Sequence, residues 1–238
     1  PSDLELNSVY QADLAIQSGC GLAAEALAAM PAITNRPWDD WTAARQADYQ
    51  DNIKPKPAPG PLNMSEVMAH LNEVLPADAI VCNGAGNSTA WLHRHFQYRD
   101  FRTQAAPTSG AMGYGVPAAV AASLLYPTRD VVAVVGDGCF QMAMAELGTT
   151  AQYGGTPVII VVNNSMYGTI RMHQEREYPT RVIATDLVNP NFVELAKSYG
   201  WYAAQITKTE EFAGAYKVAK DSGKAALLEL VIDPEAIT

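Results

Sequence analysis

The amino-acid sequence predicts a doubly wound α/β fold with a mainly parallel, six-stranded sheet. The first observation is a set of short apolar segments without polar alternation, such as VVAVVG at 131–136. The second is that helical segments separate these runs along the chain. Apolar strands that alternate with helices are typical of a parallel sheet covered on both faces. The six strands are expected at 79–83, in the apolar run near Phe101, and at 131–136, 157–164, 202–206 and 225–232.

Helices are expected in the intervals between these strands. Ser65 is the candidate N-cap of a helix that continues to about Val74, because a serine hydroxyl can accept a bond from a free N–H of the first turn. Further helices are expected from about Ser88, from about Met112 to Leu125, from near Gln141, at 191–199 and at 209–221. With the strands, they complete the alternating pattern of an α/β domain.

The chain divides by composition into three segments. Residues 62–238 contain the alternating pattern and are expected to form the main domain. Residues 31–61 are rich in proline, which predicts a linker with one helical stretch. Within residues 1–30, the part from 11 onward reads as a short apolar strand, a Ser-Gly-Cys-Gly turn and an Ala-rich helix, too small to bury a core. Because the first residue is Pro1, we expect a fragment, a processed chain or one piece of a split protein.

Charge and cysteine content narrow the function classes. The net charge is −9, from 16 basic and 25 acidic residues, which disfavours binding to nucleic acid or to an anionic membrane surface. No apolar run approaches the length of a membrane span. Cys20, Cys82 and Cys139 lie far apart without metal-binding spacing, so we expect a reducing, cytoplasmic location and no disulfide framework.

Polar or glycine-rich turns follow three of the expected strands. NGAGNST at 83–89 offers glycines and a helix N-terminus, where free N–H groups can bind an anion. Asp137 lies between two glycines directly after the strand 131–136, and Asn163 and Asn164 end the strand 157–164. The 24 residues from 139 to 162 are enough for one helix and one strand, so both motifs should meet at one edge of the sheet. Carboxylate and amide oxygens there suit Mg²⁺.

The pattern GDG, about 24 residues, then NN resembles the thiamine-diphosphate-binding motif of acetolactate synthases, pyruvate decarboxylases and their relatives. Three further segments are similar to this family: GAGNSTAW at 84–91, TSGAMGYGVPAA at 108–119 and NNSMYGTI at 163–170. The resemblance covers essentially all of 62–232, and residues 1–30 look like the end of the family's middle domain. It implies the thiamine diphosphate-binding fold for residues 62–238.

The resemblance also implies roles for individual residues. Asp137, the side chain of Asn164 and the backbone carbonyl of Met166 would bind Mg²⁺. Met112 would lie beneath the cofactor and force its two rings into a bent conformation, with the backbone of Gly110 at the aminopyrimidine. The diphosphate and its surroundings would be held by Gly86, Asn87, Ser88, Gly138, Cys139 and Gly168.

By this resemblance the chain is part of a thiamine-diphosphate- and Mg²⁺-dependent enzyme that decarboxylates or carboligates a small 2-oxo acid. The family's catalytic glutamate lies on an N-terminal, pyrimidine-binding domain of the neighbouring subunit, and nothing in this chain matches that domain. A partner chain or subunit, in a homodimer or tetramer of the whole enzyme, is therefore expected. His173 occupies a position where acetolactate synthases usually carry a tryptophan, so the product stays open, as does the presence of FAD.

Other interpretations of these residues also stay open. The chain could be a non-catalytic remnant of the same fold, or a nicotinamide-binding domain, although Thr89 replaces the third glycine of that fingerprint. Met112 could pack in a core, and Cys139 could be an activated thiol rather than a backbone ligand. His93 and His95 alternate as in a strand or loop and are expected at a surface or interface. The charged residues Arg171, Glu175, Arg176 and Glu177 are expected on a solvated or mobile face.

Overall fold

The computed structural model describes residues 5–236, which fall into two compact units that divide between Asp48 and Tyr49. The first unit contains α1 (Cys20–Ala28) and most of α2 (Asp39–Asn52), and neither helix has a buried residue. The expected Ala-rich helix and the helical stretch in the proline-rich segment are therefore confirmed. The expected strand before Ser18 is wrong, since residues 11–19 contain no strand and Leu14 is 77% exposed. A lone apolar run has no neighbouring strand to accept its backbone hydrogen bonds.

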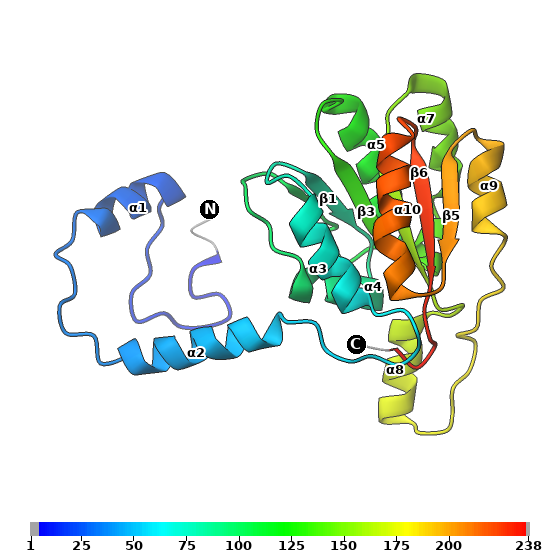
Figure 1. Ribbon diagram of the computed structural model, residues 1–238. Helices are drawn as coiled ribbons and strands as arrows, with labels where there is room; N and C mark the ends of the chain where they lie inside the picture. The colour runs from blue at the N-terminus through cyan, green and yellow to red at the C-terminus, as the bar shows by residue number, and fades with distance from the viewer. Residues whose placement is uncertain (1–4, 237–238) are drawn as a thin grey trace. The chain divides into compact units, whose positions relative to one another are not determined.

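The second unit is built on a six-stranded sheet in which every pairing is parallel (Figure 1). This confirms the predicted α/β fold. The strand order is β2-β1-β3-β4-β6-β5. The bounds are β1 (Ile80–Asn83), β2 (Gln104–Ala105), β3 (Val131–Gly136), β4 (Val158–Asn163), β5 (Tyr202–Ile206) and β6 (Ala226–Val231). The short β2 lies just beyond the apolar run in which it was expected, and Phe101 itself is 82% exposed.

Helices cover both faces of the sheet, and each face has its own apolar core (Figure 1). On one face, side chains of the strands pack against α3 (Met64–Val74), α4 (Asn87–His95) and α10 (Thr209–Asp221). On the other face they pack against α5 (Gly115–Leu125), α6 (Asp137–Gln141), α7 (Leu147–Tyr153) and α9 (Phe192–Ser198). The strands are apolar throughout because both of their faces are buried.

Several helices begin at other residues than expected. Asn63, not Ser65, caps α3, and its side chain accepts a hydrogen bond from the Ser65 amide at 3.0 Å. α5 begins at Gly115 rather than near Met112, since Gly113 has a φ of +82° that a right-handed helix cannot contain. The helix expected near Gln141 begins at Asp137, directly after β3, and is followed by a short 3₁₀ turn and α7.

Two regions differ more from the expectation. His93 and His95 lie on α4, not on a strand or loop, and His95 is buried, with its Nδ1 atom 2.9 Å from the carbonyl oxygen of Ile53. Residues 168–177 form α8 (Gly168–Glu177), which the sequence analysis did not anticipate. Its Arg171 pairs with Glu175 at 2.9 Å and with Glu235, so part of this charged cluster is ordered by ion pairs. Within residues 5–236, no helix combines the length and apolar character needed to cross a membrane.

The chain topology creates a crevice at one edge of the sheet. After β1 the chain runs through α4, on one face of the sheet, to β2 on one side of β1. After β2 it runs through α5, on the opposite face, to β3 on the other side of β1. Connections that diverge in this way separate beyond the carboxyl ends of the strands, and ligands of open α/β sheets bind at such switch points. The turns after β1, β3 and β4 all lie at this edge.

Candidate functional site

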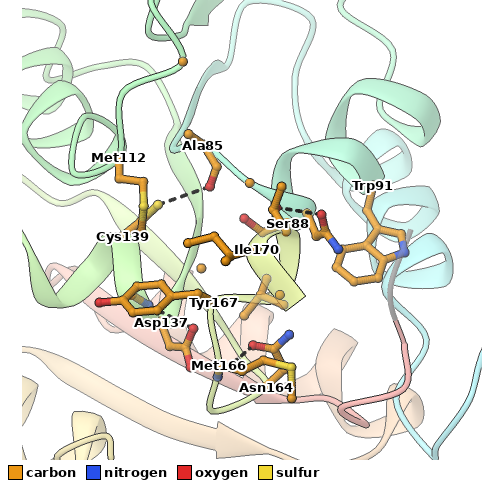
Figure 2. Close-up of a pocket in the computed structure, with 18 residues that line it drawn as sticks. Ala85, Ser88, Trp91, Met112, Asp137, Cys139, Asn164, Met166, Tyr167 and Ile170 are labelled. Atoms are coloured by element: carbon orange, nitrogen blue, oxygen red, sulfur yellow. Dashed lines mark hydrogen bonds between the residues drawn. The ribbon is translucent and has the colours of Figure 1, made fainter. Parts of the chain in front are cut away.

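A cavity of about 250 Å³ lies beyond the carboxyl ends of β1, β3 and β4 (Figure 2). Its lining comes from the three turns that follow these strands, from the start of α8 and from the segment before α5. The lining includes every residue that the sequence analysis assigned to the site: Gly86, Asn87, Ser88, Gly110, Met112, Asp137, Gly138, Cys139, Asn164, Met166 and Gly168. Parallel pairing of neighbouring strands brings these distant segments to one place.

The turn after β1 presents hydrogen-bond donors to the cavity. Gly86 adopts a φ of +99°, a conformation that side chains rarely tolerate, and α4 begins at the next residue. The Nδ2 atom of Asn87 and the Oγ atom of Ser88 are buried and have no hydrogen-bond partner among the described residues. Buried polar atoms are normally paired, so two such atoms on one cavity wall indicate a polar ligand.

The turn after β3 holds the buried carboxylate of Asp137, which is 2% exposed. Its Oδ1 atom accepts a hydrogen bond from the Gly138 amide at 2.9 Å, and its Oδ2 atom accepts one from Nδ2 of Asn189 at 2.8 Å. Burial raises the pKa of Asp137, and the hydrogen bonds, led by the one from Asn189, act in the opposite direction. Gly138 has no room for a side chain, since a Cβ atom there would lie 2.7 Å from Cε1 of Tyr167.

The two adjacent asparagines at the end of β4 direct their side chains to different places. Asn163 is 8% exposed and directs its amide nitrogen to Glu229 Oε1, at 2.7 Å. Asn164 lines the cavity, and its Oδ1 atom accepts a hydrogen bond from the Met166 amide at 3.3 Å. Ser165, the residue after Asn164, has a φ of +55°, which reverses the chain. Figure 2 shows the side chains of Asp137 and Asn164 on the same side of the cavity.

Hydrogen bonds hold the turns to one another. The thiol of Cys139 donates to the carbonyl oxygen of Ala85 at 3.2 Å, which joins the turn after β3 to the turn after β1 (Figure 2). The hydroxyl of Thr169 in α8 donates to Oδ1 of Asn87 at 2.7 Å. Cys139 is 2% exposed, so its side chain ties two turns together and is not presented as a reactive thiol.

The segment before α5 carries Met112. Its side chain lines the cavity and is 37% exposed, so it is not packed in the core of this unit. Gly110 and Gly113 on either side have φ values of +66° and +82°. Two left-handed residues turn the backbone sharply here and leave Met112 on the cavity wall.

The lining suits a metal-bound diphosphate. The carboxylate of Asp137, the amide oxygen of Asn164 and the carbonyl of Met166 are hard oxygen donors, the kind that Mg²⁺ takes together with phosphate oxygens. Asn87 and Ser88, whose side-chain donors are unpaired, line the same cavity at the N-terminus of α4 and suit an anion. The residues present therefore fit a diphosphate cofactor with a divalent cation.

Comparison with known proteins agrees with this geometry. Residues 84–230 match the family model described as thiamine pyrophosphate enzyme, C-terminal TPP binding domain. The chain belongs to this family. Family membership replaces the nicotinamide-binding interpretation, because the glycines after β1 are part of the matched thiamine diphosphate-binding domain.

Individual relatives of this thiamine diphosphate-binding chain are acetolactate synthases and a decarboxylase. The acetolactate synthase large subunit of Parasynechococcus marenigrum is 34% identical over 214 residues, which are 87% of this chain and 34% of that protein. The isozyme 2 large subunit of Escherichia coli is 31% identical over 171 residues, 70% of this chain and 31% of that protein. This chain spans about a third of the length of these relatives.

A solved structure gives the same picture. The thiamine diphosphate-dependent 4-hydroxybenzoylformate decarboxylase of Rhodococcus jostii RHA1 superposes with a TM-score of 0.69 at 28% identity. The match covers 75% of this chain and 34% of that structure. The likeness to a thiamine diphosphate enzyme therefore extends from sequence to fold.

Some residues that line the cavity were not assigned to the site from the sequence. The lining also includes Trp91, Tyr167, Thr169 and Ile170. Nothing in the local sequence of Trp91 or Tyr167 distinguishes a residue of a cavity wall from a residue of an apolar core. Asn189 contacts Asp137 across 52 residues, and the Asn-Pro dipeptide at 189–190 indicates only a turn. His173 is exposed on α8 and is outside the described lining; its Nδ1 atom lies 2.9 Å from Nη2 of Arg176.

Proposed function

We propose that this chain binds the diphosphate of thiamine diphosphate and a Mg²⁺ ion in the cavity, and that it supplies this half of an active site acting on a small 2-oxo acid. The observation that carries the proposal is the meeting of Asp137, Asn164 and the unpaired donors of Asn87 and Ser88 in one cavity at the switch point. Decarboxylation, carboligation or both are the reaction types, by analogy with the named relatives.

Each side of the cavity has a separate task in this proposal. Asp137, the side chain of Asn164 and the carbonyl of Met166 hold Mg²⁺, which neutralises the diphosphate. Met112 supports the bent cofactor from below, and Gly110 meets the aminopyrimidine. Bound thiamine diphosphate supplies a carbon nucleophile that adds to the 2-oxo group. The diphosphate oxygens are held by Gly86, Asn87, Ser88, Gly138, Cys139 and Gly168.

The proposed active site is completed by another chain or subunit. The chain spans about a third of the relatives' length, and its matched part is their C-terminal domain. We propose that residues 62–238 are this domain, that 31–61 are a linker and that 1–30 end a middle domain. A pyrimidine-binding domain with its glutamate comes from a partner, in a homodimer or tetramer of the whole enzyme. Three free cysteines, of which Cys82 and Cys139 are buried, support a reducing cytoplasm.

A complementation assay tests the proposed function. The purified chain, with saturating thiamine diphosphate and Mg²⁺, should not consume pyruvate, because the proposal takes the glutamate at the pyrimidine from a partner. Consumption of pyruvate or of a larger 2-oxo acid should appear when a chain that carries the N-terminal domain is added. The same mixture with Asp137→Ala should stay inactive, whereas Asp221→Ala, which removes an equally charged but 63% exposed carboxylate, should be active.

Two outcomes would contradict the proposal. Turnover by the purified chain alone would show that it contains its own acid and is not a half-site. A correctly assembled complex that binds the cofactor but converts no 2-oxo acid would favour the non-catalytic remnant instead.

A further inference from the structure

Asn189 joins the two motifs that the proposed function assigns to the metal site. It lies in the segment between α8 and α9, outside any helix or strand. Its Nδ2 atom lies 2.8 Å from Oδ2 of Asp137 and 2.8 Å from Oδ1 of Asn163. A primary amide has two N–H donors, so both hydrogens of Asn189 are used, one at the end of β3 and one at the end of β4.

Two acceptor oxygens fix the orientation of this amide. If it were rotated by half a turn, its oxygen would face the oxygens of Asp137 and Asn163, and both contacts would be repulsive. Asn163 cannot turn to relieve this, because its nitrogen donates to Glu229. In the observed orientation, Oδ1 of Asn189 accepts a hydrogen bond from Nε2 of Gln141 at 2.6 Å.

The hydrogen bonds of Asn189 continue through Asn163 into the sheet. Asn163, which accepts from Asn189, donates to Oε1 of Glu229 at 2.7 Å. Glu229 lies in the middle of β6, is 4% exposed, and accepts a second bond from Gln205 of β5 at 3.0 Å. A continuous series of hydrogen bonds therefore runs from β5 and β6 through Asn163 and Asn189 to the carboxylate of Asp137.

This arrangement fixes the carboxylate of Asp137 before any ligand arrives. The Gly138 amide holds one oxygen and Asn189 holds the other, so rotation of the carboxylate would break a hydrogen bond on each side. We propose that Asn189 is a positioning residue of the metal site, which orients Asp137 for a divalent cation and sets its place relative to the end of β4. The inference rests on the proposed function, because it assumes that the cation binds at Asp137.

Outer partners of metal ligands set affinity by holding the ligands in place, and their loss typically costs about 10- to 100-fold. Asn189→Ala removes both donors without adding charge. Asn191→Ala, the same change two residues away, is the matched control. It removes the N-cap hydrogen bond that the Glu194 amide donates to Oδ1 of Asn191 at 3.0 Å, and so weakens α9 without touching the site.

The experiment is a calorimetric titration of the protein as purified, in whatever complex it is expressed. Mg²⁺ is titrated at saturating thiamine diphosphate, and thiamine diphosphate is titrated at saturating Mg²⁺. Asn189→Ala should raise the Mg²⁺ concentration at half-saturation by about 10- to 100-fold and leave cofactor binding at saturating Mg²⁺ near wild type. Asn191→Ala should lower the melting temperature of the ligand-free protein and leave the Mg²⁺ titration unchanged.

The possible failures are distinguishable. Wild-type Mg²⁺ affinity in Asn189→Ala would overturn the positioning role and leave the proposed function intact. Equal weakening by both variants would also overturn it, because general destabilisation would then explain the loss. A wild-type protein that binds thiamine diphosphate without any need for Mg²⁺ would overturn the proposed metal site and this inference with it.

Discussion

Glycine residues at the cavity determine how closely its turns approach one another. A Cβ atom at Gly115 would lie 2.5 Å from Cγ1 of Val135 and 2.9 Å from the carbonyl carbon of Asn83, so α5 can reach the sheet only at a glycine. At Gly138 the obstacle is the ring of Tyr167, which itself lines the cavity. The size of the cavity thus depends on single positions that carry no side chain.

Gly138→Ala should push the Tyr167 ring out of place and weaken binding of thiamine diphosphate. Overpacking of this kind costs about 1–3 kcal/mol of unfolding free energy, which a chemical denaturation curve measures. Gly214→Ala is the control. Gly214 lies in the middle of α10 on its exposed side, and a Cβ atom added there would have nothing within 4 Å. That change should stabilise the protein by roughly 0.5–1 kcal/mol. Unaltered stability and cofactor binding in Gly138→Ala would show that the Tyr167 ring moves freely.

At the residue scale, the residues that the sequence analysis assigned to the site all line the cavity, but Trp91 and Tyr167 were missed, and so was Asn189, which holds the Asp137 carboxylate. The GDG and NN motifs can be found from the local sequence, because an Asp between glycines and paired asparagines at a strand end are unusual. Asn189 carries no such signal, and its partner Asp137 lies 52 residues earlier in the chain. Contacts of this kind follow from how segments pack, which the local sequence does not encode.

At the element scale, the apolar strands were predictable because burial on both faces leaves no place for polar residues. β3 and β5 begin and end where the sequence indicated, as does α10. α8 was missed because its sequence GTIRMHQERE is mostly polar and only Gly168 is buried. The strand expected between residue 11 and the turn at Ser18 was wrong for a different reason: an apolar run forms a strand only where a neighbouring strand exists.

β6 contains the exception to the apolar pattern, and it tests how the sheet supports the site. Glu229→Ala would leave the Asn163 and Gln205 amides without their buried acceptor. An unpaired buried donor costs about 1–3 kcal/mol. Only the Asn163 amide is buried, since Gln205 is exposed on β5, so the unfolding free energy should fall by about 1–3 kcal/mol in a denaturation experiment. Glu73→Ala, at an exposed position of α3, should change it by less than about 0.5 kcal/mol. Comparable small effects at both positions would mean that water or rearrangement satisfies the two amides.

At the scale of the whole molecule, the second unit places its cavity at the open edge of the sheet. The sheet buries its faces under its own helices, whereas the cavity lies at the open edge where the strands end. Met112 is 37% exposed on this edge. In the proposed function, this fold holds the diphosphate side of the cofactor, and a partner covers the rest.

A crystal structure of the protein grown with thiamine diphosphate and Mn²⁺ in place of Mg²⁺ is the most direct test of the proposed metal site. The anomalous signal of Mn²⁺ identifies the metal independently of any assumption about its ligands. We predict one strong peak between Asp137 and Asn164, about 2.1 Å from their side-chain oxygens as for Mg²⁺, in contact with the diphosphate. A cofactor bound elsewhere, or a metal peak away from both side chains, would contradict this prediction.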